Sequence, residues 1–193
     1  MGLPTTLYLV RHATSQPSRN VEESAWPLSA PGHEEARALA DCLIDVKPST
    51  IVSSPYLRAT QTVMPLAKRL GLAIHVIDDL RERNVSDGLI DDFLCEMERS
   101  WRDFDYALPG CESNKEAQKR VTRAMASVVG ANVGTTVIVS SHGNLIALFL
   151  NHAEQSFGYL DWSRMQNPDV FRFTWESDTF VWDRAYRWTD ACA

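Results

Sequence analysis

"LYLVRHAT", residues 7–14, is an apolar run that ends in an arginine and a histidine. Leu7 to Val10 do not alternate apolar and polar side chains, which is typical of a strand covered on both faces in a parallel sheet. Burial of Arg11 and His12 would be costly without a partner, because a desolvated charge must be paired. The stretch therefore predicts an interior strand whose carboxyl end meets a ligand.

Two more apolar runs, residues 51–52 and 137–139, lead into pairs of serines and predict further strands of the same kind. Residues 73–77 suit a fourth strand, and alternating aromatic residues over 170–182 predict a late antiparallel hairpin. Helical spacing of apolar residues fills the intervals, and capping residues mark helix starts near Ser29, Ser54 and Ser113. We expect an α/β three-layer sandwich, with a mostly parallel central sheet flanked by helices, in a single domain over residues 1–193.

Composition narrows the classes of function. The net charge of -6 argues against nucleic-acid binding, which requires a basic face. No apolar run is long enough to span a membrane, and no secretory leader is visible. The four cysteines are scattered without metal-ligand spacing, which favours reduced thiols and a cytoplasmic location.

Residues that suit anion binding follow three of the predicted strands. Arg11 and His12 end the first, Arg58 lies in the first turn of the helix after the second, and His142-Gly143 follow the third. Ligands of open α/β sheets bind outside the carboxyl ends of the strands. Two guanidinium groups and the backbone N–H groups of a helix start both favour phosphate, so we expect a phosphate site at this edge.

Six segments together resemble the histidine phosphatase superfamily, which includes phosphoglycerate mutases and small phosphatases. The similarity runs from about residue 5 to about residue 150. The segments are "LYLVRHAT", "PLSAPGHEEARALA", "IVSSPYLRATQTV", "DLRERN", "PGCESNKEAQKRV" and "VIVSSHGN".

The resemblance implies a mechanism without a metal or another cofactor. His12 would attack phosphorus and form a phosphohistidine. Arg11, Arg58 and His142 would bind the phosphoryl oxygens and neutralise the charge that develops during transfer. His12 must then present a neutral nitrogen, so we expect its other ring nitrogen to donate to a fixed acceptor such as a backbone carbonyl.

The resemblance also implies a general acid in a pattern like Leu-x-Glu, and Glu82 fits that pattern. Asp78 and Asp79 are the alternatives, and "DDLRERN" could equally be a solvated run of charges. A phosphate-binding asparagine common in the family is replaced here by Ser18, with Asn20 two residues later. Either residue could make that contact.

The leading hypothesis is a phosphomonoesterase that acts on a small phosphorylated metabolite, without a nucleic-acid or membrane partner. The second is a phosphoglycerate mutase, and the third is a non-catalytic phosphate-binding domain. A mutase must shield its phosphoenzyme from water, and this chain has little room for lid segments outside residues 83–112. Substrate preference should depend on residues 14–28 and 83–112, where the resemblance is weakest, and the oligomeric state stays open.

Overall fold

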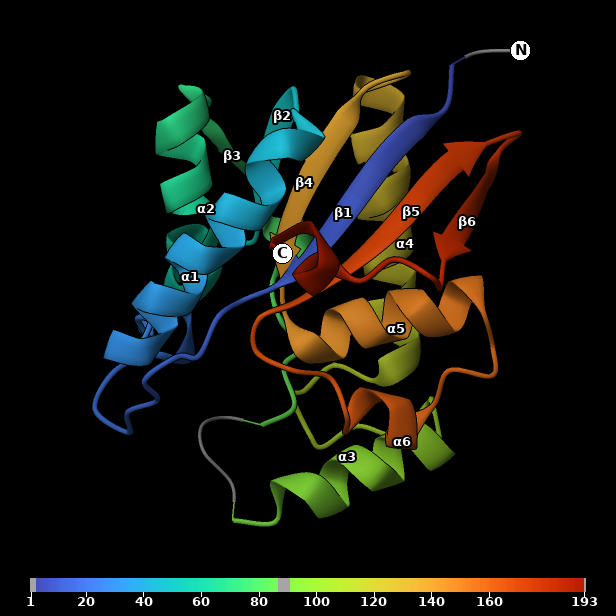
Figure 1. Ribbon diagram of the computed structural model, residues 1–193. Helices are drawn as coiled ribbons and strands as arrows, with labels where there is room; N and C mark the ends of the chain where they lie inside the picture. Colours follow the sequence, from blue (N-terminus) through green and yellow to red (C-terminus); the bar gives the residue numbers. More distant parts are fainter. Residues whose placement is uncertain (1–2, 87–90, 193) are drawn as a thin grey trace.

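The computed structural model describes residues 3–86 and 91–192, and within them the chain forms a six-stranded sheet (Figure 1). Its strands lie in the order β3-β2-β4-β1-β5-β6. The strands are β1 (Thr5–Arg11), β2 (Thr50–Ser53), β3 (Ile74–Val76), β4 (Thr136–Ser141), β5 (Asp169–Glu176) and β6 (Thr179–Asp183). β1 to β4 run parallel, whereas β5 is antiparallel to β1 and to β6. This is the expected α/β fold with a late hairpin.

Two of the three helix starts predicted from capping residues are confirmed. The α-helices are α1 (Ala30–Leu43), α2 (Leu57–Leu70), α3 (Phe93–Arg102), α4 (Asn114–Ala131), α5 (Gly143–Ala153) and α6 (Tyr159–Trp162). Short 3-10 helices are η1 (Glu23–Ala25), η2 (Ile44–Val46), η3 (Asp78–Leu80) and η4 (Trp188–Cys192). Ser29 caps α1, and the capping box of Ser113 and Glu116 starts α4 as predicted. The second helix begins later than expected, because Tyr56 and not Ser54 is its N-cap residue.

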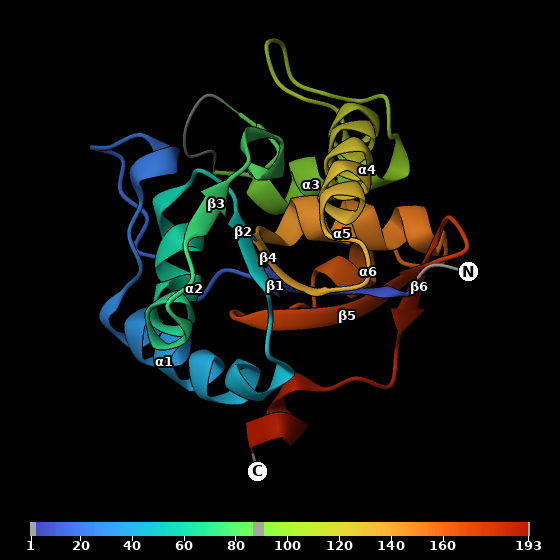
Figure 2. The same ribbon diagram turned by 90° about the horizontal axis from the view of Figure 1, so that it is seen from above.

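Helices cover both faces of the sheet, as Figure 2 shows, with α1 and α2 on one side and α4 and α5 on the other. Successive residues of β1 point to opposite faces, so Leu7 packs with the α4–α5 layer and Tyr8 with the α1–α2 layer. The apolar, non-alternating sequence of this strand follows from that double coverage.

Strand register places the predicted functional residues at one edge. Arg11 pairs with Ser141 across β1 and β4, and Ser53 pairs with Ser140 across β2 and β4. The N–H of His12 donates to the carbonyl of Ser141 at 3.0 Å, so the chain leaves β1 directly beside the end of β4. The carboxyl ends of β1, β2 and β4 therefore open onto the same space.

Three further findings bear on the sequence predictions. No helix among the described residues is both long and apolar enough to cross a membrane. Cys42 is disulfide-bonded, so the expectation of reduced cysteines is wrong at this position. Four residues of the predicted specificity segment 83–112, residues 87–90, lie outside the described residues.

Candidate active site

His12 is buried at the end of β1, and its contacts fix its tautomer. Arg58 Nε lies 3.2 Å from His12 Nε2, and a guanidinium can only donate, so Nε2 carries the lone pair. The proton therefore lies on Nδ1, which donates to the carbonyl of Ala13 at 2.8 Å. Burial and the charges of Arg58 and Arg11 lower the pKa of His12 to about 3. The imidazole is thus neutral at physiological pH, with Nε2 as its nucleophilic atom.

Arg58 is held between a carboxylate and two aromatic rings. Its Nη2 donates to Glu23 Oε1 at 2.6 Å, and its Nη1 donates to the carbonyl of the same residue at 2.8 Å. The guanidinium lies 4.9 Å from the ring centre of Tyr56 and 5.6 Å from that of Trp26. No local signal in the sequence marks the contact with Glu23, which lies 35 residues from Arg58. Tyr56 lies within the "SPYLRA" motif, two residues before Arg58, and could have been proposed from that position.

His142 is fully buried beside His12, with a distance of 5.3 Å between the two ring centres. Its Nε2 lies 2.7 Å from Ser54 Oγ at the end of β2. Within the described part of the chain, no hydrogen-bond partner reaches its Nδ1. Burial, followed by the charge of Arg58, lowers the pKa of His142 well below its usual value. A neutral ring with one unpaired nitrogen therefore faces the same region as His12.

Arg11 depends on the glycine that starts α5. A Cβ on Gly143 would lie 2.7 Å from Arg11 Nε and 2.8 Å from Cζ, so only glycine leaves room for the guanidinium. Arg11 Nη1 donates to the carbonyl of Met165 at 2.8 Å, whereas no described residue bonds its buried Nε. Burial lowers the pKa of Arg11, and the carboxylates of Glu82 and Asp169 act in the opposite direction.

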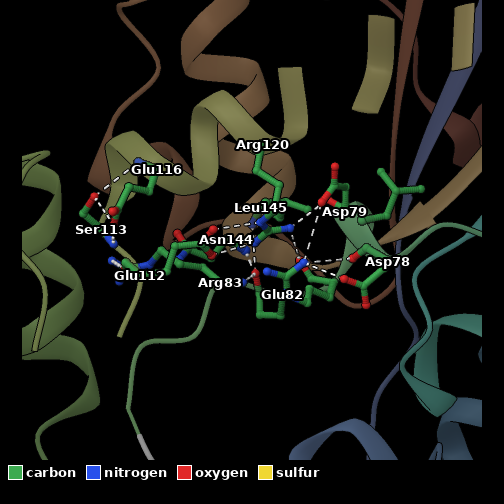
Figure 3. Close-up of polar contacts among 12 residues, drawn as sticks. Asp78, Asp79, Glu82, Arg83, Glu112, Ser113, Glu116, Arg120, Asn144 and Leu145 are labelled. Atoms are coloured by element: carbon green, nitrogen blue, oxygen red, sulfur yellow. Dashed lines mark hydrogen bonds and ion pairs between the residues drawn. The ribbon is translucent and has the colours of Figure 1, made fainter. Parts of the chain in front are cut away.

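Glu82 occupies the start of α5, where we expected a phosphoryl group (Figure 3). Its Oε1 accepts the N–H groups of Leu145 and Arg83, both at 2.9 Å, and its Oε2 accepts that of Asn144 at 3.1 Å. The favourable anion at this helix N-terminus is thus the protein's own carboxyl group. Burial raises the pKa of Glu82 above its usual value, despite these hydrogen bonds.

The two alternative acids are engaged elsewhere. Asp78 pairs with Arg81 at 2.8 Å, and Asp79 pairs with the exposed Arg123 at 3.0 Å. Both carboxylates point away from the α5 start in Figure 3. Glu82 is the candidate whose carboxyl group lies at the start of α5, and burial raises its pKa.

Ser18 and Asn20 are not brought to His12. Both line a cavity of about 770 Å³ that also includes Glu23, Trp26 and Tyr56. A smaller cavity of about 360 Å³ contains the site itself, and Trp26 lines both; its lining residues include Arg11, His12 and Arg58. Ser18 and Asn20 therefore line a cavity that adjoins the one containing His12, with Trp26 between the two.

Two residues that the sequence analysis missed hold the backbone around His12. Asn167 Nδ2 donates to the carbonyl of His12 at 2.7 Å, and the N–H of Ala13 donates to Thr62 Oγ1 at 2.9 Å. Thr62 lies in the "LRATQT" segment after Arg58, so its spacing was available in the sequence. Asn167 lies 155 residues from His12 along the chain, and no local signal marks it.

In this arrangement the side chains can bind a tetrahedral anion beside a neutral imidazole. Arg11 and Arg58 supply positive charge, His12 supplies a lone pair, and Glu82 contributes a half-buried carboxyl group at the start of α5. Among the described residues, no group of three histidine, cysteine, aspartate or glutamate side chains could hold a metal ion. The fold and the site together define an α/β protein with two arginines and a neutral histidine at the carboxyl edge of its parallel strands, and these groups can bind a phosphoryl group.

Comparison with known proteins identifies the family. The model of the histidine phosphatase superfamily (branch 1) matches residues 7–187, and the chain belongs to this superfamily. Members of this superfamily among the relatives are named as phosphatases or as mutases.

Three similar proteins illustrate the activities named within the superfamily. Probable phosphoglycerate mutase GpmB of Salmonella paratyphi C (strain RKS4594) is 31% identical over 192 residues, covering 91% of this chain and 87% of the relative. A mycobacterial glucosyl-3-phosphoglycerate phosphatase, solved in complex with inorganic phosphate, is 25% identical with a TM-score of 0.76, over 92% of this chain and 95% of that one. Phosphoglycerate mutase from Bacillus anthracis str. Sterne, 19% identical with a TM-score of 0.79 over 94% and 92%, shares the fold.

Proposed function

We propose that the protein is a phosphomonoesterase that hydrolyses a small phosphorylated metabolite through a phosphohistidine on His12. The observation that carries the proposal is the 3.2 Å contact between Arg58 Nε and His12 Nε2. It sets the lone pair of a neutral imidazole next to a guanidinium that can bind the phosphoryl oxygens. The phosphate complex of the mycobacterial phosphatase supports a ligand of this chemistry.

In the first step, His12 Nε2 attacks phosphorus, the P–O bond to the organic group breaks, and Glu82 gives its proton to the departing alkoxide. Arg11 Nε and His142 Nδ1 lack partners among the described residues, so both can bond the phosphoryl oxygens as charge develops. In the second step, water attacks the phosphohistidine and returns its proton to the Glu82 carboxylate. Inorganic phosphate leaves, and His12 is again neutral.

The hydrogen bonds of Glu82 indicate which of its oxygens carries the acid proton. Oε1 already accepts two backbone N–H groups, whereas Oε2 accepts one. A carboxyl oxygen has two lone-pair positions, so the free position lies on Oε2. We assign the transferable proton to Oε2, and the burial that raises the pKa of Glu82 favours the protonated form.

A mutase is the second candidate, and the name of the Salmonella relative favours it. In a mutase the phosphohistidine would return its phosphoryl group to a hydroxyl of a phosphoglycerate and not to water. Parallel assays for phosphate release and for interconversion of 2- and 3-phosphoglycerate separate the two. A higher rate of interconversion than of hydrolysis would replace our leading proposal by the second.

The experiment that tests the proposal is a phosphate-release screen over many phosphomonoesters, with His12→Ala as the control. We expect the wild-type protein to hydrolyse at least one ester and to form an acid-labile phosphoenzyme, and the variant to do neither. An unaltered rate in the variant would refute the role of His12. A wild-type protein that binds inorganic phosphate but is inert on the whole panel would establish the non-catalytic alternative.

The expectations of a single domain and of a cytoplasmic location stay as proposals. We propose that residues 1–193 act as one domain, because the family match and one continuous sheet cover most of the chain. A cytoplasmic location also stays a proposal, and the disulfide at Cys42 weakens the cysteine argument that supported it.

A further inference from the structure

The segment that carries Glu82 has little regular structure of its own. It follows the short β3, contains the single 3-10 turn η3 and continues past Glu82 as irregular chain. Leu80 packs into the core, and its carbonyl accepts a hydrogen bond from Ser141 Oγ at 2.8 Å. The position of the Glu82 backbone must therefore be set largely by contacts from other elements.

Arg120 of α4 supplies such contacts before Glu82 in the chain (Figure 3). Its Nη1 donates to the carbonyls of Asp79 at 2.7 Å and of Arg81 at 3.0 Å. The second of these carbonyls belongs to the peptide bond that joins Arg81 to Glu82. The side chain of Arg120 is 6% exposed, so these bonds are made in a poorly solvated environment.

Glu112 supplies the contacts after Glu82. Its N–H donates to the carbonyl of Asn84 at 2.9 Å, and its own carbonyl accepts Arg83 Nη1 at 3.2 Å. Glu112 precedes the capping box of α4, so its backbone is anchored to a long helix.

One ion pair joins the two sets of contacts. Arg120 Nε donates to Glu112 Oε1 at 2.8 Å, and Arg120 Nη2 donates to Glu112 Oε2 at 2.6 Å. A guanidinium can bind a carboxylate with two nitrogens and still donate from the third, whereas the ammonium of lysine has no such planar fork. The ion pair thus links the contacts before Glu82, made by Arg120, to the contacts after Glu82, made by the backbone of Glu112.

We propose that Arg120, through its ion pair with Glu112, is a positioning residue for the proton donor Glu82. This inference rests on the proposed phosphatase function. Arg120 donates hydrogen bonds to the carboxylate of Glu112 and to the carbonyls of Asp79 and Arg81. It therefore acts on Glu82 through the backbone of residues 79–84. Small displacements of a catalytic group are costly, since about 1 Å of misplacement can lower a rate by about a hundredfold.

The test compares two substrates whose leaving groups need a proton to different degrees. The nitrophenolate of p-nitrophenyl phosphate leaves without protonation, whereas the alkoxide of glycerol 3-phosphate needs the general acid. The measured quantity is the ratio of kcat/KM for the two substrates. Partial misfolding lowers the active fraction equally for both, so it does not move this ratio.

The main variant is the double substitution Arg120→Met with Glu112→Leu. Replacing both members of a buried ion pair by apolar residues of similar size often preserves stability, whereas removing one leaves an unpaired charge. We expect kcat/KM for glycerol 3-phosphate to fall by about tenfold or more and that for p-nitrophenyl phosphate to change by less than about threefold. Arg120→Lys, which keeps the charge without the fork, should change the ratio in the same direction and serves if the double variant does not fold.

Arg123→Met is the matched control. Arg123 lies one turn further along α4, is 72% exposed and bonds the carboxylate of Asp79 without touching the carbonyls. We expect Arg123→Met to leave the ratio unchanged. An unchanged ratio in both Arg120 variants would overturn the proposal.

Glu82→Gln distinguishes a failure of the proposed function from a failure of the positioning role. If Glu82→Gln does not move the ratio, the acid role of Glu82 in the proposed function fails; if it does and the Arg120 variants do not, only the positioning role fails.

Discussion

Arg58 is shared between His12 and Glu23. Its Nε donates to the nitrogen that we propose as the nucleophile, at 3.2 Å, while its Nη2 bonds the Glu23 carboxylate at 2.6 Å. The side chain of Arg58 is 4% exposed and that of Glu23 is 40% exposed, so the carboxylate lies toward solvent. A phosphoryl group that approaches His12 therefore meets an arginine already bound to an anion of the protein itself.

This sharing predicts that Glu23→Gln strengthens phosphate binding. Removal of the negative charge frees the guanidinium from a competing partner, and a partly exposed ion pair of this kind contributes about 1 kcal/mol. The inhibition constant of inorganic phosphate should accordingly fall by about fivefold in a steady-state assay. Glu22→Gln is the control, because Glu22 is exposed, lines the same cavity and carries the same charge. Equal inhibition constants in the wild-type protein and the Glu23 variant would contradict the prediction.

Gly143→Ala should lower activity by displacing Arg11. The added Cβ would lie 2.7 Å from Arg11 Nε, and the guanidinium would have to move from its place beside α5. We expect kcat/KM to fall by tenfold to a hundredfold, on the order of the cost of misplacing a binding group. Gly130→Ala provides the comparison, since nothing lies within 4 Å of its Cβ position in α4. That substitution should leave activity unchanged and should raise the melting temperature slightly, because alanine favours helix.

Activity should decline at alkaline pH because Glu82 must be protonated to donate. Burial raises the pKa of Glu82, so the acid form persists to higher pH than for an exposed glutamate and is lost as the pH rises through that pKa. We expect kcat for an alkyl phosphate to show this alkaline limb in the wild-type protein. In Glu82→Gln the rate should be about a hundredfold lower, and the limb should be missing. A limb that persists in the variant would assign it to another group.

Stability should decrease at acid pH through His12. Its pKa is about 3 in the folded protein and about 6.5 in an unfolded chain, so between these values only the unfolded state binds the proton. The free energy of unfolding contributed by this group is complete above about pH 6.5 and is lost as the pH falls toward 3, by roughly 1 kcal/mol per pH unit. Denaturant titrations between pH 4 and 6 should therefore show a shallower dependence in His12→Asn than in the wild-type protein. Parallel slopes would indicate that His12 is not buried neutral in solution.

The fold could be predicted because its signals are local. The unbroken apolar run of β1, the capping box of Ser113 and Glu116, and the aromatic alternation over 170–182 each act over a few residues. The convergence of Arg11, His12, Arg58 and His142 followed from one topological rule, since parallel strands end at the same edge of a sheet. The observed register of β1, β2 and β4 confirms that their ends meet.

The contacts that tune the site could not be predicted in the same way. Glu23 lies 35 residues from Arg58, and Glu82 lies 62 residues from Asn144, with no periodicity or spacing that links either pair. The start of α5 looked like a phosphate site, and only the folded chain shows that Glu82 fills it. Ser18 and Asn20 were candidates by position in a motif, yet the loop after β1 places them in the neighbouring cavity.

Short stretches of sequence were enough to predict the layers, the strand that leads to Arg11 and His12, and the resemblance to the family. Tertiary structure decided which groups are paired: Glu23 with Arg58, Glu82 with the backbone of α5, and Arg120 with Glu112. The physical reason is that secondary structure follows from short-range patterns of burial, whereas pairing of buried polar groups depends on distances between segments far apart in the chain. The contacts of the proposed proton donor Glu82 and of the ion pair between Arg58 and Glu23 depend on such distances.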